Sequence, residues 1–566
     1  MDKGFFKGFT PQLFISLQTY NKEKFVGDLL SGLIVGIVAL PLALAFGIAS
    51  GVTPEQGIIT AIIAGFIISF LGGSRVQIGG PTGAFIVIVY GVVQSHGIKG
   101  LIIATIIAGV ILVLLGVFKL GKIIKFIPYP ILVGFTSGIA VTIFTTQITD
   151  VFGLNFAGEK VPGDFVGKWI LYCKYFGTVN WWNTLISMAS ICIIVLTPRV
   201  VKKIPGSLVA IIIITIAAYL LKTYMGVNAI DTIGDRFRIN AEIPNAEIPD
   251  INMATITDLF PVAITIAMLG AIESLLSATV ADGVVGGEKH NSNTELIAQG
   301  VANIVAPLFG GIPATGAIAR TMTNINNGGR TPVAGIIHAL VLLLILLFLM
   351  PLAQYIPMAC LAGVLIIVAY NMSEWRSFRA LLKNQKSDVA VLLITFFLTV
   401  LFDLTIAIEV GLILAVVLFL KRINEVTHVS VIKNQLDMSD NSEFHQDNEI
   451  LTLPDGVEVY EIDGPFFFGI ANKFDESMRQ IRDNSKIRII RMRLVPFIDS
   501  TGLHNLTSLC RKSMNDGIQV ILSGVKPEVY AVIKHSEIPE MIEEINICDN
   551  INAALTRARK ILADKN

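Results

Sequence analysis

Two short segments rich in glycine and proline, residues 79–85 and 311–320, interrupt long apolar stretches of this chain. In a lipid bilayer an interrupted backbone is tolerated only where protein or a water-filled cavity covers it. Corresponding interruptions in two halves of a membrane protein indicate where a solute binds. Pro81 and Pro313 can each stand at the first position of a helix, so that free N–H groups and the positive dipole end face whatever lies ahead. Two such ends meeting inside the membrane would bind an anion.

The composition is that of an integral membrane protein. Hydrophobic residues make up 53% of the chain and charged residues only 15%, whereas a soluble protein carries about a quarter charged residues. The formal net charge is zero, which gives no reason to expect a nucleic-acid partner. Five cysteines are scattered without CxxC spacing, which argues against a disulfide framework or a zinc site.

About fourteen apolar runs are long enough to span a bilayer or to form half of a span. An odd number in each half turns the second half upside down relative to the first, which makes an inverted repeat. The first set of seven lies near residues 28–49, 57–72, 80–93, 99–118, 128–149, 183–198 and 205–222. The second set lies near residues 259–281, 294–309, 315–326, 332–350, 355–370, 387–402 and 404–420.

The loop charges predict the orientation. Basic residues gather in alternate loops such as 119–125, 199–203 and 376–386, while the longest of the loops between them, 223–257, is acidic. By the positive-inside rule the basic loops face the cytoplasm. Both termini are then cytoplasmic, and we expect a multi-pass protein of the cell's inner (plasma) membrane.

Three parts are expected along the chain: a cytoplasmic N-terminal segment (1–27), a transmembrane domain (28–422) and a cytoplasmic α/β domain (430–566). In the last part, β-branched runs at 457–462, 487–494 and 518–523 predict strands. Helical patterns near 472–483, 501–515, 526–535 and 549–562 alternate with them, which favours an α/β layer fold.

Glu273 is an ionisable residue in the middle of an apolar helix, where such a group costs about 2.5–3.5 kcal/mol on insertion scales. It shares one helix face with Gly270 and Ser277. That face would border the anion cavity, and Glu273 would take up a proton or help to hold a cation. Burial and a neighbouring anion both favour a protonated carboxyl. The alternative is a carboxyl that only hydrogen-bonds to a neighbouring helix.

Arg320 lies one turn after Gly316 and would place a fixed positive charge near the anion. Alternatively it reaches the membrane boundary or neutralises Glu273. Thr82 and Thr315 offer hydroxyls at the helix starts, either to the substrate or as local caps. The remaining candidate is an aromatic residue that either lines the cavity or only packs, Phe46.

Several further patterns carry weaker predictions. Residues 292–295 form a capping-box pattern, after which Glu295, Gln299 and Asn303 follow one helix face. His338, the only histidine within a predicted span, is expected to be a packing residue with satisfied hydrogen bonds. No Ser-His-Asp arrangement, phosphate-binding loop or metal-ligand spacing is recognisable, so we expect no catalytic site, metal or cofactor.

In the soluble part, Ser500 follows a strand and opens a helix, where a phosphate would gain from the helix N-terminus. The alternative is that Asp499 or Ser500 merely caps that helix.

Residues 41–47, 79–84, 270–277, 313–320 and 328–332 together resemble the SulP anion transporters over nearly the whole chain. Residues 499–502 resemble the phosphorylated-serine loop of anti-sigma-factor antagonists, which indicates a STAS domain. The resemblance implies fourteen membrane segments in a 7+7 inverted repeat of the uracil-permease type. It also implies core and gate domains with an elevator-like motion, a homodimer, and a STAS domain able to bind a cytoplasmic protein.

The resemblance also implies a site between the third and tenth helix starts, bordered by the first and eighth spans. The expected coupling-ion residues are Glu273 and Ser277, and the expected regulatory residue is Ser500. The substrate residues are then expected to be Phe46, Thr82, Gly83, Ala84, Thr315, Gly316, Ala317 and Arg320.

The subtype is less sharply indicated. Residues 270–276 and 313–320 look like bacterial members that symport protons with dicarboxylates, whereas residues 40–51 also look like cyanobacterial sodium–bicarbonate carriers. Those carriers have Asp in place of Glu273 and a Thr in place of Ile318, and a lost hydroxyl weakens a sodium site. Many sulfate-type members have Gln in place of Leu42, so a polar contact with the substrate is missing here.

Proton-coupled anion symport is therefore favoured over sodium-coupled bicarbonate symport. An uncoupled anion exchanger or channel, and a membrane sensor that signals through its soluble domain, are two further hypotheses. The choice among bicarbonate, sulfate, chloride and dicarboxylates stays open.

Overall fold

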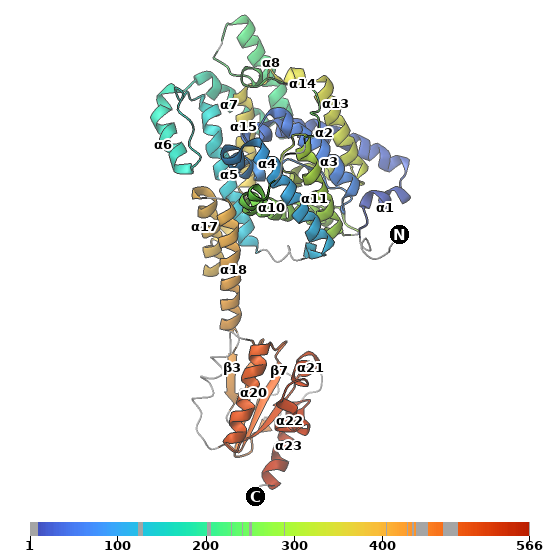
Figure 1. The fold of residues 1–566 in the computed structure, drawn as a ribbon, viewed down its shortest axis with the longest axis vertical. Coiled ribbons are helices and arrows are strands. Elements are labelled where there is room, and N and C mark those ends of the chain that lie inside the picture. The colour runs from blue at the N-terminus through green and yellow to red at the C-terminus, as the bar shows by residue number, and fades with distance from the viewer. Residues whose placement is uncertain are drawn as a thin grey trace. The chain divides into compact units, whose positions relative to one another are not determined.

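The computed structural model of the chain is shown in Figure 1. It describes residues 9–122, 128–200, 205–227, 229–239, 241–247, 249, 252–287, 289–402, 404–426, 428–432, 435–436, 451–467 and 485–564. The chain forms two compact units, Met1–Ala415 and Val416–Asn566.

The first unit is helical, and every apolar run predicted as a span forms a helix or part of one. The first half contains α2 (Lys22–Ala49), α3 (Pro54–Leu71), α4 (Ile86–Val117), α5 (Tyr129–Phe152), α7 (Trp181–Val200) and α8 (Gly206–Tyr224). The second half contains α10 (Met253–Val285), α11 (Ser292–Leu308), α12 (Ile318–Asn326), α13 (Val333–Phe348), α15 (Met358–Met372), α17 (Lys386–Leu401) and the start of α18 (Leu404–Val426). By length and composition, eight candidate spans among the described residues can cross a membrane.

The helix α4 (Ile86–Val117) contains the second part of the predicted run 80–93 and nearly all of the run 99–118. Gly97 divides it with φ 69° and ψ −175°, a conformation that glycine adopts without the steric cost a side chain would bring. The third and fourth spans are therefore two helical stretches joined at a kink at Gly97.

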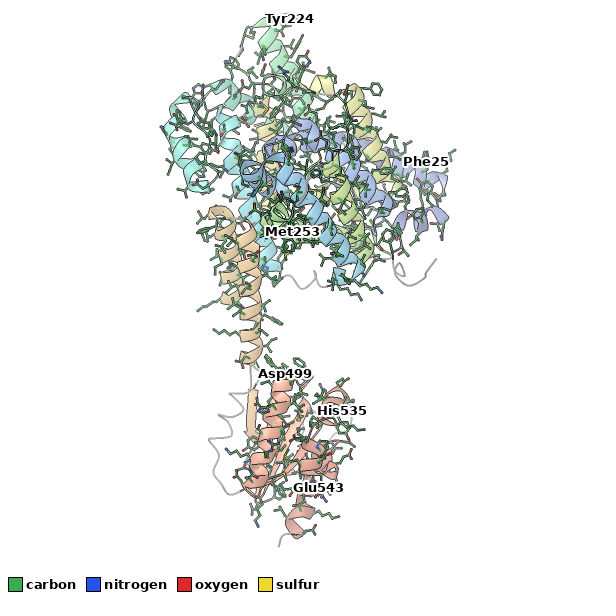
Figure 2. The ribbon with its side chains drawn as sticks, viewed as in Figure 1. Phe25, Tyr224, Met253, Asp499, His535 and Glu543 are labelled. Carbon is green, nitrogen blue, oxygen red and sulfur yellow. The ribbon has the colours of Figure 1, made fainter. Side chains whose placement is uncertain are left out.

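The spans pack into two groups. In the core group, α11 packs on α4 and α3, α13 packs on α2 and α3, and α10 packs on α4 and α12. In the gate group, α5 packs on α15 and α17, and α7 packs on α8 and α15. Large apolar side chains remain exposed on the outside of these helices, Phe25, Tyr224 and Met253 among them (Figure 2). An exposed apolar exterior of this kind is suited to lipid.

Short helices complete the first unit. They are α1 (Gln12–Gln18), α6 (Phe165–Tyr175), α9 (Ile233–Arg236), α14 (Met350–Ala353) and α16 (Trp375–Leu381). The sequence did not indicate α6, because only apolar length was used to find helices there. It packs on α5, and its Tyr172 stacks on Phe156 of the loop that follows α5, with ring centroids 6.0 Å apart.

Asp28 of α2 is fully buried and binds the turn that precedes α13. Its carboxylate accepts hydrogen bonds from the backbone N–H groups of Arg330 (2.8 Å) and Thr331 (3.1 Å). The hydroxyls of Thr331 (2.5 Å) and Tyr20 (3.1 Å) also donate to it. With four donors, the carboxylate is compensated for the loss of water, and it fixes the turn before α13 to α2.

The second unit contains a five-stranded sheet with strand order β3-β6-β7-β8-β9. The strands are β3 (His428–Ile432), β6 (Val457–Asp463), β7 (Ile487–Leu494), β8 (Gln519–Ser523) and β9 (Ile547–Cys548). The first pair is antiparallel and the others are parallel. A separate two-stranded ladder joins β4 (Gln435–Leu436) to β5 (Leu451–Thr452).

Helices cover both faces of this sheet because side chains alternate along each strand. Ile490 and Leu522 belong to a core with α20 (Ser500–Asn515), α21 (Pro527–Ile533) and α22 (Ile538–Ile542). Ile489 and Ile521 belong to a second core with α23 (Ile551–Asp564). The three predicted strands and three of the four predicted helices are confirmed, and the helix predicted near 472–483 lies outside the described residues. The short β3, β9 and α22 were not predicted.

Asp28→Ala is expected to lower the free energy of unfolding by about 3 kcal/mol, since it leaves buried donors without an acceptor. Thermal unfolding of the purified protein in detergent measures this. The matched control is Asp258→Ala, because Asp258 is 67% exposed in its ion pair with His96. A surface pair of this kind contributes less than about 1 kcal/mol. Equal effects of the two substitutions would contradict the role given to Asp28.

Candidate functional site

The two interrupted segments meet at the centre of the first unit, as the sequence predicted. Strand β1 (Gly79–Gly80) pairs antiparallel with β2 (Thr315–Gly316), with Gly79 opposite Gly316 and Gly80 opposite Thr315. The pairing is extended by the N–H of Ala317, which donates to the carbonyl of Ile78 at 2.9 Å. The ladder satisfies backbone groups that neither segment can satisfy within a helix.

Side chains from the surrounding helices satisfy further backbone groups of each segment. Thr60 of α3 accepts a hydrogen bond from the N–H of Ile312 at 2.7 Å. In the same way, Thr321 of α12 accepts one from the N–H of Ile78 at 3.1 Å. One threonine hydroxyl therefore braces the chain just before each strand, and the two halves are braced alike.

The predicted polar face of α11 connects both segments. Asn303 pairs with the backbone of Ala314, accepting from its N–H and donating to its carbonyl, both at 2.8 Å. Two turns earlier, Glu295 accepts from the N–H groups of Gly73 (2.9 Å) and Ser74 (3.1 Å) and from Gln299 Nε2 (2.9 Å). Both side chains are fully buried or nearly so. One helix thus fixes the chain that leads into each strand.

The capping-box prediction at residues 292–295 is wrong. Asn291 caps α11 instead, accepting from the N–H groups of Asn293 and Thr294. Glu295 is drawn into the loop that leads to β1, where two backbone donors need an acceptor. The local sequence around residues 292–295 does not show that these distant backbone N–H groups bind Glu295.

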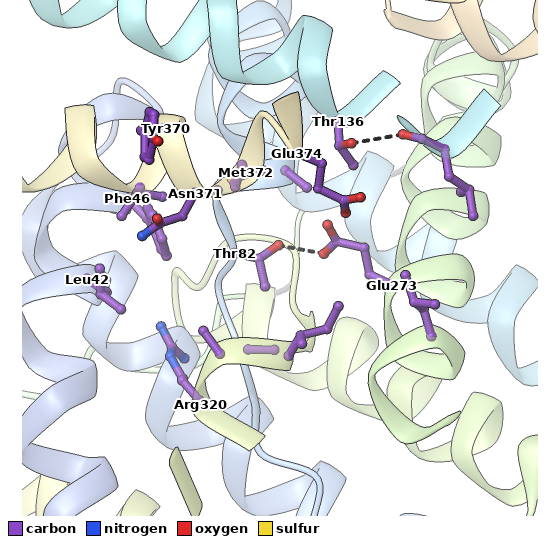
Figure 3. Close-up of a pocket in the computed structure, with 18 of the residues that line it drawn as sticks. Leu42, Phe46, Thr82, Thr136, Glu273, Arg320, Tyr370, Asn371, Met372 and Glu374 are labelled. Atoms are coloured by element: carbon purple, nitrogen blue, oxygen red, sulfur yellow. Dashed lines mark hydrogen bonds between the residues drawn. The ribbon is translucent and has the colours of Figure 1, made fainter. Parts of the chain in front are cut away.

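A cavity of about 780 Å³ lies against the paired strands, between the core and gate groups (Figure 3). Core residues from α2, α10 and both interruptions form one wall, and residues of α5, α7 and α15 form the other. Seven of the eight predicted substrate residues line it, together with Glu273: Phe46, Thr82, Gly83, Ala84, Gly316, Ala317 and Arg320.

The remaining two predicted residues, Thr315 and Ser277, lie outside the cavity lining. The hydroxyl of Thr315 donates to the Gly270 carbonyl at 3.0 Å and lies 2.6 Å from that of Ser274. Ser277 donates to Thr321 at 3.3 Å. Ser274, which the sequence analysis did not single out, also accepts from the N–H of Gly316 at 3.2 Å. These hydroxyls attach α10 to the second interruption.

Glu273 projects from α10 into the cavity, where Thr82 donates a hydrogen bond to its carboxylate at 2.9 Å (Figure 3). The bond links α10 to the first interruption. The cavity holds a second carboxylate, that of Glu374, which the hydroxyl of Tyr129 approaches at 3.5 Å. Sequence reasoning missed Glu374. A carboxylate placed between an apolar run and a basic loop is unusual, and this position could have indicated that Glu374 has a role in the cavity.

Arg320 is 2% exposed and anchored within the site. Its Nη2 donates to the carbonyl of Pro81 at 3.1 Å, and its Nη1 has no hydrogen-bond partner among the described residues. Gly80 has a φ of 152°, and a Cβ there would collide with Nη1, so a glycine is needed. Arg320 neither reaches the membrane boundary nor forms an ion pair with Glu273 in the described part of the chain.

The cavity also receives two helix starts. The short 3-10 turn η1 (Gly83–Phe85) leads into α4, and α12 begins directly after Ala317. The first N–H groups of a helix have no partner within it and carry partial positive charge. Together with Arg320 they give this wall of the cavity the positive character that favours an anion.

Two histidines of the first unit lie outside the cavity lining. His338 is fully buried, and neither ring nitrogen has a protein group within hydrogen-bonding geometry in the described regions. His290 lies between Asp282 (Nδ1 to Oδ2, 2.7 Å) and Ser292 (Nε2 to Oγ, 3.0 Å), an arrangement the sequence did not reveal. Because Asp282 also accepts from the backbone N–H of His290, the trio closes the turn between α10 and α11.

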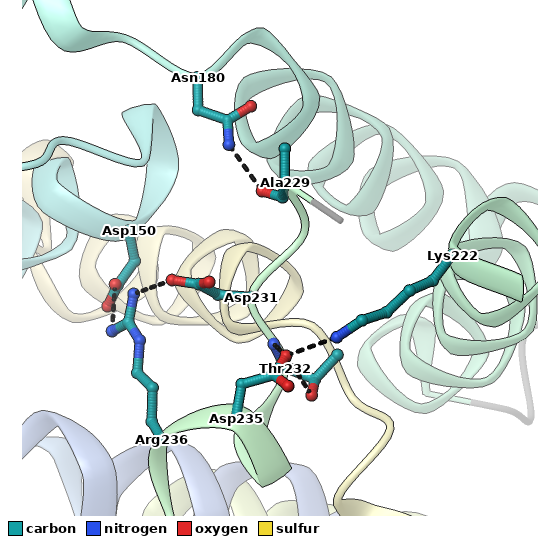
Figure 4. A network of polar contacts seen from close by, with 8 residues as sticks. All are labelled: Asp150, Asn180, Lys222, Ala229, Asp231, Thr232, Asp235 and Arg236. Atoms are coloured by element: carbon teal, nitrogen blue, oxygen red, sulfur yellow. Dashed lines mark hydrogen bonds and ion pairs between the residues drawn. The ribbon is translucent and has the colours of Figure 1, made fainter. Parts of the chain in front are cut away.

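The loop after α8 is attached to the gate group by a polar network (Figure 4). Arg236 bridges Asp150 of α5 (2.7 Å) and Asp231 (3.1 Å), and Lys222 of α8 pairs with Asp235 (2.7 Å). Burial acts to raise the pKa of Asp235. Its hydrogen bonds with Lys222 and with the backbone and hydroxyl of Thr232 outweigh this effect, so the pKa lies below its usual value. The network joins gate elements to one another, so it stiffens this group.

In the second unit, Asp499 caps α20 by accepting from the N–H of Gly502 at 2.7 Å. Ser500 is the first residue of that helix and is exposed. The capping function considered for both residues therefore belongs to Asp499. No group of three or more His, Cys, Asp or Glu residues is placed to hold a metal ion within the described ranges.

Comparison with known proteins agrees with this architecture. Residues 25–395 match the profile of the Sulfate permease family, and residues 450–554 match that of the STAS domain. The chain is 41% identical over 511 residues to YvdB of Bacillus subtilis (strain 168), which has a provisional sulfate-transporter name, covering 90% of this chain and 93% of that protein. It is 31% identical over 525 residues to the bicarbonate transporter BicA of Picosynechococcus sp., covering 90% of each.

Solved structures give the same fold. The murine Slc26a9 anion transporter in its inward-facing state superposes with a TM-score of 0.88 at 19% identity, covering 99% of this chain and 95% of that one. The transmembrane domain of a cyanobacterium bicarbonate transporter, BicA, superposes with a TM-score of 0.61 at 32% identity, covering 70% and 98%. This is the fold with fourteen segments in two inverted sets of seven. The chain therefore belongs to the sulfate permease family of anion transporters and carries a STAS domain.

Proposed function

We propose that this protein is a secondary active transporter that carries a small anion together with a proton. The observation that carries the proposal is that one cavity contains both groups that attract an anion and a carboxyl group that repels it when ionised. Arg320 and two helix starts attract an anion, while Glu273 repels one whenever it is ionised.

The binding of the anion and the binding of the proton to Glu273 are linked by electrostatics. In a cavity of low dielectric constant a carboxylate close to a bound anion raises the energy of both charges. Protonation of Glu273 removes that repulsion, and bound anion in turn favours the protonated carboxyl. Each ligand therefore strengthens the binding of the other, which is the requirement for symport.

The motion that we propose is elevator-like. The anion-binding groups, Glu273 and Arg320 among them, all belong to the core group, whereas the gate group supplies only the opposite wall. Braces such as Asn303 hold the paired strands to the core helices. The anion would therefore move with the core group past a gate group that stays fixed.

Proton coupling is better supported than sodium coupling. A hard cation requires several oxygen ligands. Ile318 lines the cavity without an oxygen, and Ser277 lies outside the lining with its hydroxyl bonded to Thr321. Glu273 would be left with few oxygen neighbours to complete a sodium site.

The relatives suggest the substrate class. Their names specify sulfate and bicarbonate, and we extend the class to small dicarboxylates because the resemblance seen in residues 270–276 and 313–320 implies them. A cavity of about 780 Å³ accommodates any of these anions.

The cellular setting is also a proposal. The basic loops support a plasma-membrane protein with both termini in the cytoplasm. We propose a homodimer and a cytoplasmic protein partner for the STAS domain. Ser500, exposed at the start of α20, is the proposed regulatory residue there.

Wild-type protein in liposomes is expected to accumulate the anion when an inward proton gradient is imposed. Glu273→Gln should lose this accumulation and keep downhill exchange, because the amide resembles a permanently protonated carboxyl. The control is Glu159→Gln, since Glu159 lies in an exposed ion pair with Lys174 outside the cavity. Accumulation that ignores the gradient in the wild type, or persists in Glu273→Gln, would refute the coupling mechanism.

Arg320→Gln is expected to raise the KM for the anion about 10- to 100-fold, as the loss of a charged hydrogen bond worth about 1.5–3 kcal/mol requires. Initial uptake rates over a range of anion concentrations give KM and kcat separately. Arg330→Gln serves as the control, because Arg330 donates to the carbonyls of Ile325 and Gly329 outside the cavity. An unchanged KM in Arg320→Gln would remove Arg320 from the site.

Asp499→Ala is expected to lower the stability of the second unit by about 1 kcal/mol through loss of the helix cap, and Ser500→Ala should not. Ser500→Glu places negative charge at the helix start and should change the uptake rate if this serine is regulatory. Thermal unfolding and uptake, measured on the full-length protein, separate the two residues. Equal uptake by Ser500→Glu and Ser500→Ala would argue against regulation at this position.

A further inference from the structure

Two buried side chains beside the paired strands have polar atoms without partners. Nη1 of Arg320 and both ring nitrogens of His338 lack a hydrogen-bond partner in the described part of the protein. The carbonyl of Gly335, one turn before His338, is near the ring but outside hydrogen-bonding geometry. An unsatisfied buried group costs about 1–3 kcal/mol, and more when charged. His338 does not line the cavity, so the anion cannot satisfy it.

Helix α3 presents its smallest residues to both side chains. A Cβ on Gly65 would lie 3.5 Å from Nδ1 and 3.4 Å from Cε1 of His338, and 3.2 Å from a carbonyl oxygen of β1. A Cβ on Gly80 would lie against Nη1 of Arg320 and 3.4 Å from the Cα of Ala61. Ala61 and Gly65 are one turn apart on the same face of α3. The guanidinium and the imidazole therefore border neighbouring turns of one helix face.

The two groups are also within electrostatic range, since the charge of Arg320 acts on His338. In its neutral form an imidazole supplies one donor and one acceptor, while a guanidinium supplies donors only. A direct bond is not formed, but a water molecule can accept from Nη1 and donate to the imidazole acceptor. Buried waters typically occupy such polar sites with several hydrogen-bonding neighbours.

We propose that His338 is a positioning residue for Arg320, acting through ordered water held in the notch that Ala61 and Gly65 leave in α3. The Pro81 carbonyl fixes Nη2, and the water fixes Nη1, so the plane of the guanidinium is set relative to the cavity. Orientation matters because the donors of arginine form a rigid fork. This inference rests on the proposed function of Arg320 as an anion-binding residue.

The test compares full-length variants in proteoliposomes with whichever of sulfate, bicarbonate or succinate the wild type carries best. His338→Leu removes both ring nitrogens, and Gly65→Ala fills the notch. Each is expected to raise KM about tenfold with kcat within about twofold, the size of effect of one lost hydrogen bond to a charged group. His338→Gln keeps a donor and an acceptor and should stay within about threefold of the wild-type KM.

Gly363→Ala is the matched control for Gly65→Ala. Its added Cβ would meet the carbonyl oxygen of Ser187 at 3.0 Å, a similar crowding on α15 of the gate group. It should leave KM unchanged. A wild-type KM in His338→Leu or in Gly65→Ala would overturn the proposal, as would equal losses in His338→Leu and His338→Gln. If His338→Leu does not fold, the KM of Gly65→Ala decides whether the proposal stands.

A double-mutant cycle tests the link without any transport. Unfolding temperatures in detergent are measured for His338→Leu, Arg320→Gln and the double variant. Coupled residues give non-additive effects, and additive effects would overturn the proposal. A wild type that carries none of the three anions would refute the proposed function instead, and the cycle would still decide whether His338 and Arg320 are linked.

Discussion

The short antiparallel pairing of Gly79–Gly80 with Thr315–Gly316 is the interaction on which the first unit depends. Two broken segments in a membrane expose backbone groups that lipid cannot satisfy. Pairing them with each other solves part of this problem and brings two helix starts to one place. The proposed anion site is thus a consequence of satisfying the backbone: the residues at both helix starts and Arg320 line the same cavity.

The rest of the hydrogen-bonding demand is met by side chains at some distance in sequence. Thr60 and Thr321 each take one N–H from the segment of the opposite half, and Asn303 takes both backbone groups of Ala314. Half of the inverted repeat therefore cannot form the site alone. Polar residues placed in apolar helices are costly, and here the cost is offset because each one replaces a missing backbone partner.

Sequence reasoning was effective where a residue contradicts its surroundings. Glu273 in an apolar helix, and glycine and proline inside spans, point to residues that line the cavity, because lipid tolerates neither without a reason. Sequence reasoning was weaker where the function of a polar residue depends on which distant group becomes its hydrogen-bond partner. Glu295 could accept hydrogen bonds from its own helix or from a distant loop. Only the fold shows that the N–H groups of Gly73 and Ser74 donate to it. Likewise Ser274 contacts Gly316, whereas Ser277, one turn later, bonds to Thr321.

The braces also bear on how the site can work. Because α11 holds the chain before both strands, a displacement of one interruption must carry the other with it. The distance between the two helix starts is then a fixed property of the core group, and alternating access cannot come from separating them. What remains free to change is the opposite wall, formed by α5, α7 and α15. In the elevator-like motion that we propose, the intact core group would pass that wall, and in the proposed coupling mechanism a proton on Glu273 would remove the charge that repels the bound anion.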